Sequence, residues 1–243
     1  MLSIFKKKPT ASVDFSAIGT DMHSHLLPGI DDGASSSTQS IELINGLKDL
    51  GYNKFITTPH VLSDMYPNTP ETIHAAFENL KLAAGNDIPV RPAAEYFLDE
   101  GFDRLMESDQ PLLCIGNNMV LVEFSFVTAA MDFKERLFNL QIRGYQPVLA
   151  HPERYIYFTN SRNIFDELKD AGCLFAINLL SFTGYYGKGS VDLANHLLKK
   201  DYIDYLGTDA HHERHVDALR KAHSLMPVVQ RLADSGRLLN SRL

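Results

Sequence analysis

The sequence contains no tryptophan and only two cysteines among its 243 residues. Neither Cys114 nor Cys173 belongs to a Cys-x-x-Cys pair, and neither is followed by arginine six positions later. These absences exclude a disulfide scaffold, a thiolate zinc site and a Cys-x5-Arg phosphate loop. We expect both thiols to be buried and reduced, so that any phosphoester chemistry here proceeds without a thiolate nucleophile.

Long apolar runs are also missing, because no stretch reaches the ~18–20 residues of a membrane-spanning helix. The chain starts with a short apolar stretch followed by three lysines, which is the reverse of the order in a signal peptide. We therefore expect a cytoplasmic protein with no integral membrane segment. Residues 1–15 are predicted to form a flexible N-terminal arm and residues 16–243 a single domain.

Basic residues are fewer than acidic ones, 23 against 30, so the formal net charge is −7. This balance argues against general nucleic-acid binding, which requires a basic face. With 44% hydrophobic and 22% charged residues the chain has a globular composition, not that of a disordered, collagen-like or coiled-coil protein. The oligomeric state is not indicated by the sequence. Histidine, by contrast, is abundant, with ten residues.

Short apolar runs rich in β-forming residues alternate with segments of helical periodicity. The predicted strands are 17–27, 54–59, 88–97, 119–125, 146–151, 173–179 and 202–209. The predicted helices are 38–50, 71–84, 102–108, 129–142, 163–171, 192–200 and 214–232. This α/β alternation indicates parallel strands with crossover helices, and its length favours a distorted, TIM-like (β/α)7 barrel. An open doubly wound sheet is the alternative, but a glycine-rich nucleotide turn is missing.

Histidine and acidic residues recur where the predicted strands end, which is where barrel enzymes build their sites. They are His23, His25, Asp32, His60, Glu95, Glu123, His151, Asp209 and His211. The pairs at 23–25 and 209–211 have the period of two that places both side chains on one face of a strand. Five imidazoles and four carboxylates without a thiolate suit Mn, Zn or Fe(II), and nine ligands suffice for three ions.

Each of these residues alone has a simpler interpretation. A single histidine at a strand end is commonly hydrogen-bonded or exposed, and a buried Glu95 or Glu123 could pair with arginine. Nine such groups around one barrel end without metal would carry a heavy desolvation cost, so we favour metal binding. The other five histidines are not assigned to the site: three are expected on helix surfaces and two flank the last motif. They are His74, His196 and His223, and His212 and His215.

Four motifs occur in a specific order. They are Asp-Met-His-Ser-His-Leu-Leu-Pro-Gly-Ile-Asp-Asp-Gly-Ala at 21–34, Thr-Pro-His at 58–60, His-Pro-Glu-Arg-Tyr at 151–155 and Asp-Ala-His at 209–211. In this the chain resembles the PHP (polymerase and histidinol phosphatase) superfamily. Within it, the chain resembles the CpsB/CapC group of manganese-dependent protein-tyrosine phosphatases of bacterial capsule and exopolysaccharide systems. The resemblance extends over roughly residues 18–215.

The resemblance implies a PHP fold and three divalent ions, with Mn2+ expected first and Fe2+, Zn2+ or Mg2+ as alternatives. It assigns the first ion to His23, His25, Glu95 and Asp209. Glu95 would bridge to a second ion held by Glu123 and His151, and a third would be held by Asp32, His60 and His211. Arg154 and Arg214 would bind the phosphate. The general acid stays open, with His211 or a metal-bound water as candidates.

The implied activity is that of a metal-dependent phosphoric monoester hydrolase, with a hydroxide that bridges two ions as the nucleophile. The implied partner is the phosphotyrosine tail of a membrane-anchored bacterial tyrosine kinase. Aromatic residues that could surround the mouth of the site, or serve as ordinary packing, are Tyr155, Tyr157, Phe182, Tyr185 and Tyr186. Two alternatives remain: a small-molecule phosphatase of the superfamily, such as a histidinol-phosphatase, and a non-catalytic PHP scaffold.

Overall fold

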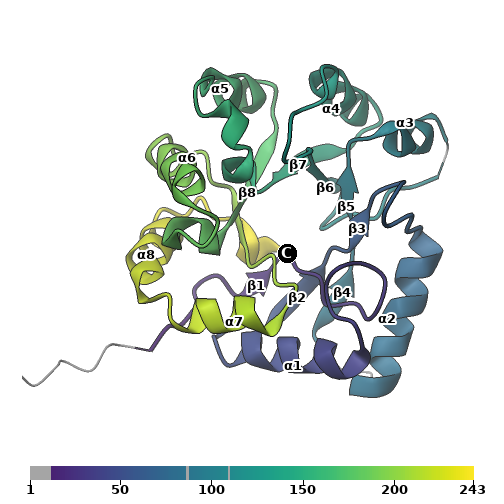
Figure 1. The fold of residues 1–243 in the computed structure, drawn as a ribbon, viewed down its shortest axis with the longest axis vertical. Helices are drawn as coiled ribbons and strands as arrows, with labels where there is room; N and C mark the ends of the chain where they lie inside the picture. The colour runs from purple at the N-terminus through teal and green to yellow at the C-terminus, as the bar shows by residue number, and fades with distance from the viewer. Residues whose placement is uncertain (1–11, 86–87, 109) are drawn as a thin grey trace, which may run out of the picture.

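The fold is a ring of parallel strands surrounded by helices that follow one another around the outside (Figure 1). It is taken from a computed structural model that describes residues 12–85, 88–108 and 110–243. The strands are β1 Thr20–Asp21, β2 Lys54–Thr57, β3 His60–Val61, β4 Val90–Pro92, β5 Glu95–Phe97, β6 Met119–Glu123, β7 Gln146–Ala150, β8 Leu174–Asn178 and β9 Tyr205–Gly207. The α-helices are α1 Ser37–Lys48, α2 Pro70–Ala84, α3 Glu100–Glu107, α4 Phe133–Ile142, α5 Asn163–Asp170, α6 Lys188–Lys199, α7 Glu213–Arg220 and α8 Met226–Asp234. The 3-10 turns are η1 Pro152–Arg154, η2 Ile156–Phe158, η3 Leu179–Thr183, η4 His223–Leu225 and η5 Asn240–Arg242.

The strands form two parallel sheets, in the orders β1-β2-β4 and β3-β5-β6-β7-β8-β9. The division arises because the strand path is interrupted twice, between β2 and β3, where β3 lies just past the predicted strand 54–59, and between β4 and β5, within the predicted strand 88–97. Pro59 lies in the first interruption and cannot donate a ladder hydrogen bond. Backbone bonds from Ala93 N to Thr57 O and from Glu95 N to Pro59 O continue the pairing across both breaks. The observed strands therefore correspond to the seven predicted ones.

The first and last strands of the series also meet. Asp209 N donates to His23 O at 2.9 Å, and His25 N donates to Ala210 O at 3.0 Å. Gly207 permits this approach, because a Cβ at that position would lie 2.8 Å from the Cβ of His23. These contacts join the two ends of the sheet, as the expected distorted (β/α)7 barrel requires and an open doubly wound sheet does not.

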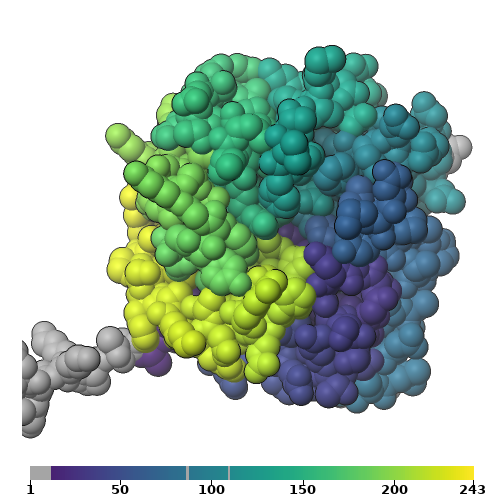
Figure 2. All heavy atoms as spheres, in the orientation of Figure 1, coloured from purple at the N-terminus to yellow at the C-terminus, as the bar shows by residue number. Residues whose placement is uncertain are grey.

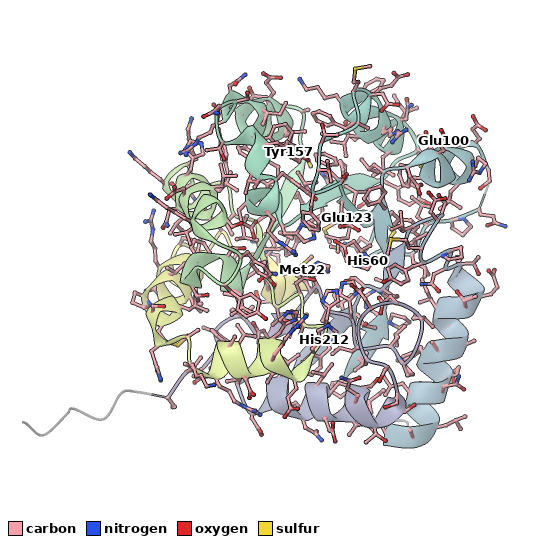
Figure 3. The ribbon with its side chains drawn as sticks, viewed as in Figure 1. Met22, His60, Glu100, Glu123, Tyr157 and His212 are labelled. Atoms are coloured by element: carbon pink, nitrogen blue, oxygen red, sulfur yellow. The ribbon has the colours of Figure 1, made fainter. Side chains whose placement is uncertain are left out.

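Apolar side chains fill the inside of the ring and form a separate cluster from the larger core beneath the helices. The inner cluster is Met22, Ile56, Ala93, Ile115, Leu121, Val148, Ala150, Ala176 and Tyr205. Figure 3 shows Met22 near the centre of the ring. At the end where the strands begin, Leu239 and Leu243 pack against this cluster. The buried Asn240 side chain there donates to Thr20 O and Leu206 O and accepts from Leu206 N, so it links β1 to β9.

Two expectations about local structure are wrong. Part of the predicted N-terminal arm is packed, because Val13 and Phe15 are buried and Phe15 N donates to Leu50 O; residues 1–11 of that arm lie outside the described residues. The helix predicted at 214–232 is two helices, α7 and α8. Pro227 lies in the first turn of α8, where its missing N–H costs nothing.

The remaining expectations from composition can be compared directly. Cys173 is buried as expected, but Cys114 is partly exposed. Neither thiol takes part in a disulfide. Within the described ranges, none of the helices combines the length and apolar character that crossing a bilayer would demand.

Candidate metal centre

The nine predicted ligands come together at the end of the barrel where the strands finish. Figure 2 shows this side of the molecule, with the segments that follow the strands meeting around a hollow near its centre. In Figure 3 the labelled His60 and Glu123 lie toward the middle of the ring, whereas Glu100 on α3 lies at its outer edge. The sequence interpretation that one barrel end collects these side chains therefore agrees with their placement.

Their donor atoms form four overlapping groups, within each of which all atoms lie within 4.8 Å of one another. The groups are His23, His25 and Glu95; His23, His151 and Asp209; His60, Glu95 and Glu123; and His25, Asp32, His60 and His211. Every one of the nine predicted residues occurs in at least one group. The overlap means that ions held here would be neighbours that share ligands.

The first predicted ligand set is compact. His23 Nε2 lies 3.4 Å from both Glu95 Oε1 and Asp209 Oδ1, and His25 Nε2 lies 3.4 Å from Glu95 Oε2 and 3.5 Å from Asp209 Oδ1. Two ligands with metal bonds of about 2.1 Å stand about 3.0–3.4 Å apart at ordinary bond angles. His23, His25 and Glu95 are therefore spaced as ligands of a common ion, whereas Asp209 shares a group with His23 and His151.

The other two sets are joined by His60. Its Nδ1 lies 3.0 Å from Glu123 Oε1 and 3.2 Å from Glu95 Oε2, while its Nε2 lies 3.5 Å from Asp32 Oδ1. His151 Nε2 lies 3.0 Å from Glu95 Oε1. The resemblance placed His60 only in the third set, whereas its ring faces the second set as well.

Several of these buried polar atoms have no hydrogen-bond partner in the described part of the chain. They are Nε2 of His23, Nε2 of His25, Nδ1 of His60, Oε2 of Glu95 and Nδ1 of His151. Buried polar atoms without partners are costly, and such a concentration in one cluster needs a compensating group. Divalent cations satisfy imidazole nitrogens and carboxylate oxygens together, so the donor set fits metal ions. Glu95 and Glu123 face imidazoles, not the arginine partners of the simpler interpretation.

Neighbouring side chains orient the two histidines of the first motif. His23 Nδ1 lies 2.6 Å from Thr58 Oγ1, and His25 Nδ1 lies 2.7 Å from Asp31 Oδ2, so both rings turn Nε2 toward the cluster. Gly33 allows the loop to fold over His25, since a Cβ there would lie 2.3 Å from the carbonyl oxygen of His25. Partners of this kind fix the ring orientation of metal-binding histidines. Thr58 and Asp31 were not predicted as site residues.

Two of the predicted ligands adopt strained backbone conformations. His151 has a φ of 35° and Asp209 a φ of 51°, in the left-handed region that residues other than glycine rarely occupy. His151 directly follows β7, and Asp209 lies two residues after the end of β9. Strain of this kind concentrates at functional sites, where the surrounding structure maintains it.

The electrostatics favour the metal-binding protonation state for some residues of the cluster and oppose it for others, because burial lowers the pKa values of His25, His60 and His151 but nearby carboxylates outweigh it and raise them. Burial lowers the pKa of His23 to about 4, and burial with the nearby His25 lowers that of His211 to about 4. Burial alone would raise the pKa of Glu95, but the imidazoles around it, first that of His23, hold it well below its usual range. Burial and His25 lower the pKa of His60, yet Glu95 and Glu123 outweigh them and raise it to about 9.

A cavity of about 260 Å³ opens beside the cluster, and six of the predicted ligands line it together with Arg154 and Arg214. Arg154 Nη1 donates to Asp209 Oδ2 at 2.8 Å. Its guanidinium carbon lies 4.4 Å from the ring centre of Phe126 and 4.2 Å from that of Tyr186. Cation–π contact on both sides holds this arginine at the cavity wall.

The predicted aromatic residues divide into two kinds. Tyr185 and Tyr186 line the cavity. Tyr155 is fully buried and donates to Ala150 O, Tyr157 donates to Ser125 O, and Phe182 packs against the large core. The last three are therefore packing residues.

Three cavity residues were not assigned to the site from the sequence: Phe126 was not considered, whereas His212 and His215 were left out as residues that flank the last motif. A fourth contribution comes from β8, which none of the nine predicted ligands follows. Asn178 at its end donates to Asp209 Oδ2 at 2.9 Å. The only sequence signal for Asn178 is that it is a polar residue at the end of a predicted strand. Its residue type and its spacing from the other site residues are not specific to a metal site.

Comparison with known proteins places this site in a family. The family described as "Capsular polysaccharide synthesis, CpsB/CapC" matches residues 19–228. Tyrosine-protein phosphatase YwqE of Bacillus subtilis (strain 168) is 30% identical over 194 residues, 79% of this chain and 76% of that protein. Tyrosine-protein phosphatase CpsB of Streptococcus pneumoniae is 28% identical over 200 residues, 79% of this chain and 82% of that protein.

A solved structure agrees with these sequence matches. A chain from the crystal structures of YwqE from Bacillus subtilis and CpsB from Streptococcus pneumoniae, described as unique metal-dependent tyrosine phosphatases, is 28% identical with a TM-score of 0.74. The match covers 91% of this chain and 94% of that chain. With a family match over most of its length and a fold shared with these enzymes, the chain belongs to the CpsB/CapC family of capsular polysaccharide synthesis proteins.

Proposed function

We propose that this protein is a metal-dependent protein-tyrosine phosphatase that hydrolyses phosphotyrosine monoesters. The observation that carries the proposal is the convergence of nine candidate metal ligands in one cluster, six of which line a cavity together with two arginines. Its relatives YwqE and CpsB are named tyrosine-protein phosphatases, which supports the same chemistry for this chain.

Three divalent ions are assigned to the cluster, with Mn2+ as the first choice. His23, His25, Glu95 and Asp209 hold the first, Glu95, Glu123 and His151 the second, and Asp32, His60 and His211 the third. When bound, such ions neutralise phosphate charge and lower the pKa of water so that it attacks phosphorus. The four carboxylates supply −4 against +6 from three ions, and the resulting +2 suits a phosphate dianion.

The chain's own residues bind and orient the ester. Arg154 and Arg214 present fork-shaped donors that match phosphate oxygens. Asp209 and the rings of Phe126 and Tyr186 hold Arg154 in place for this task. His211 lies at the cavity, but it is assigned to the third ion, and burial with the nearby His25 lowers its pKa to about 4, so the predicted role of general acid does not suit it. A tyrosyl oxygen has a pKa of about 10 and leaves more readily than an alkoxide, so it needs less help.

The proposed substrate is the phosphotyrosine tail of a membrane-anchored bacterial tyrosine kinase that controls capsule or exopolysaccharide synthesis. The family description, which refers to capsular polysaccharide synthesis, supports this assignment. The exposed rings of Phe126 and Tyr185 at the cavity offer flat surfaces to an aryl phosphate. Action on such a tail places the protein in the cytoplasm.

The test compares substrates on Mn2+-loaded protein. We expect turnover of a phosphotyrosyl peptide and little turnover of histidinol phosphate, with activity lost in His23→Ala and Asp209→Ala. Exclusive turnover of histidinol phosphate would instead identify a small-molecule phosphatase. If the loaded protein cleaved no aryl phosphate, and both variants altered only stability, the domain would be a non-catalytic scaffold.

A further inference from the structure

His215 is a buried histidine of the cavity that the proposed function does not use. It lies in α7, its side chain is only 7% exposed, and it lines the same cavity as Arg154 and Arg214. Its ring packs edge-on against Tyr185, with 5.4 Å between ring centres. The site therefore contains an imidazole that is not among the predicted metal ligands.

One nitrogen of this ring is already engaged. The backbone N–H of His211 donates to His215 Nδ1 at 3.1 Å. A ring nitrogen that accepts a hydrogen bond carries no proton, so the proton of His215 must be on Nε2. The contact thus fixes a neutral ring whose only N–H is at Nε2.

That N–H is free to bind a ligand. Nε2 of His215 has no hydrogen-bond partner among the residues that the structure describes. The atom is not fully buried. The charged and titratable groups around the ring are Asp209, His211, His212, Arg214, Arg154 and Tyr185. An unpaired donor beside two arginines, in a cavity next to a metal cluster, is positioned to contact an anion.

We propose that His215 is a further catalytic residue whose Nε2–H donates a hydrogen bond to a non-bridging oxygen of the bound phosphoryl group. The proposal rests on the proposed function and adds a neutral donor to the two cationic ones. Arginines and divalent ions already make the cavity positive, so another cation would be repelled there. A neutral N–H adds a directed hydrogen bond without that repulsion.

Two substitutions distinguish a contact with phosphate from a purely structural role of His215, because the two roles predict opposite orders of activity for the variants. His215→Asn keeps an acceptor near the Nδ1 position for the His211 amide but has no donor at the Nε2 position. His215→Gln brings an amide N–H to the Nε2 position but loses the acceptor near Nδ1. If His215 contacts phosphate, the Gln variant is the more active; if it only supports His211, the Asn variant is.

The experiment measures kcat/KM, metal content and affinity for inorganic phosphate in both variants of the Mn2+-loaded protein. We expect His215→Asn to lower kcat/KM and phosphate affinity by about 10- to 100-fold with metal content unchanged, and His215→Gln to stay within about threefold of wild type. The reverse order, or loss of metal from His215→Asn, would overturn the proposal.

Two further measurements separate the possible failures. For a non-bridging contact, the loss in His215→Asn is equal for phenyl phosphate and p-nitrophenyl phosphate. A loss that grows with the pKa of the leaving phenol would place the contact on the leaving oxygen and refute this assignment. If wild-type protein cleaves no aryl phosphate, the proposed function fails, while calorimetric phosphate binding still decides whether His215 is an anion donor.

Discussion

Arg154 and Asp209 form an ion pair at the boundary between the proposed metal cluster and the cavity. Nη1 of Arg154 lies 2.8 Å from Oδ2 of Asp209, whereas Oδ1 of the same carboxylate faces His23 and His25. The carboxylate of Asp209 therefore contacts Arg154, the proposed phosphate-binding residue, with one oxygen. Its other oxygen faces the proposed metal ligands His23 and His25. Phosphate binding and metal binding meet at Asp209.

Replacement of Arg154 tests whether this residue serves phosphate binding and not metal binding. Arg154→Ala removes the fork-shaped donor but no metal ligand, so we expect kcat/KM to fall by about 100- to 1,000-fold with the metal content unchanged. Arg154→Lys keeps the charge without the planar fork and should recover only part of the activity. Arg237→Ala, at an exposed arginine, is the control. Elemental analysis that finds metal lost from Arg154→Ala would make Arg154 a structural residue.

Metal removal and thiol modification should have opposite consequences. A chelator is expected to abolish phosphatase activity and to lower the melting temperature, because ions that bind only the folded state stabilise it. Alkylation should leave activity largely intact, since Cys173 is buried and the partly exposed Cys114 is not among the residues that line the cavity. Activity that survives chelation but not alkylation would contradict the mechanism.

Metal affinity should depend on pH in a defined direction. In the metal-free protein the carboxylates around His60 raise its pKa to about 9, so the ring is protonated at pH 7 and must lose a proton to bind an ion. Affinity for Mn2+ should therefore rise as the pH increases toward 9. Calorimetry in buffers of different ionisation enthalpy should show proton release, and His60→Gln should release fewer protons. Affinity that does not depend on pH would refute this.

The same shift has a consequence for the stability of the metal-free protein. Because the folded pKa of His60 lies above its ordinary 6.5, its contribution to stability is complete below pH 6.5 and is lost as the pH rises toward 9. The metal-free protein should thus lose stability over this range, while the metal-loaded protein, whose His60 carries no proton, should not. Urea unfolding of both forms at pH 6 and pH 9 measures the difference.

Asn178 is expected to act on the metals without binding them. It donates to Asp209 Oδ2, and its own Oδ1 accepts from Leu180 N. Loss of a partner that holds a metal ligand costs about 10- to 100-fold in metal affinity, so Asn178→Ala should bind Mn2+ more weakly by this factor. Asn178→Asp should be weaker still, since a second carboxylate would repel Asp209. Asn195→Ala, at an exposed position of α6, should leave metal affinity unchanged, and an equal loss there would refute the assignment.

The metal cluster could be predicted because it follows two strong regularities. Parallel strands finish at one barrel end, and the His-x-His and Asp-x-His pairs place both side chains of each pair on one face. The supporting residues have no such signature. Asp31, Thr58 and Asn178 are common polar types in loops or at strand ends, and only the folded arrangement brings them to the rings and carboxylate that they orient.

The errors in the predicted elements also have physical causes. Apolar spacing continues from α7 through η4 into α8, so periodicity alone joins them, although Pro227 is a typical residue for a new helix start. Val13 and Phe15 lie in a short stretch without periodicity, and their burial depends on contact with distant parts of the chain such as Leu50. Isolated apolar residues near a terminus give no sign of whether they pack.

The contact between β1 and β9 is stabilised by different interactions at its two ends. Where the strands begin, the amide of Asn240 bonds to both neighbours and needs no other component. Where they finish, Asp209 N donates to His23 O and His25 N donates to Ala210 O, and the side chains of His23, His25 and Asp209 meet there as candidate metal ligands. Ions bound to them would therefore add cross-links between side chains to a seam that backbone hydrogen bonds already close, so that metal uptake would make this end of the barrel more rigid.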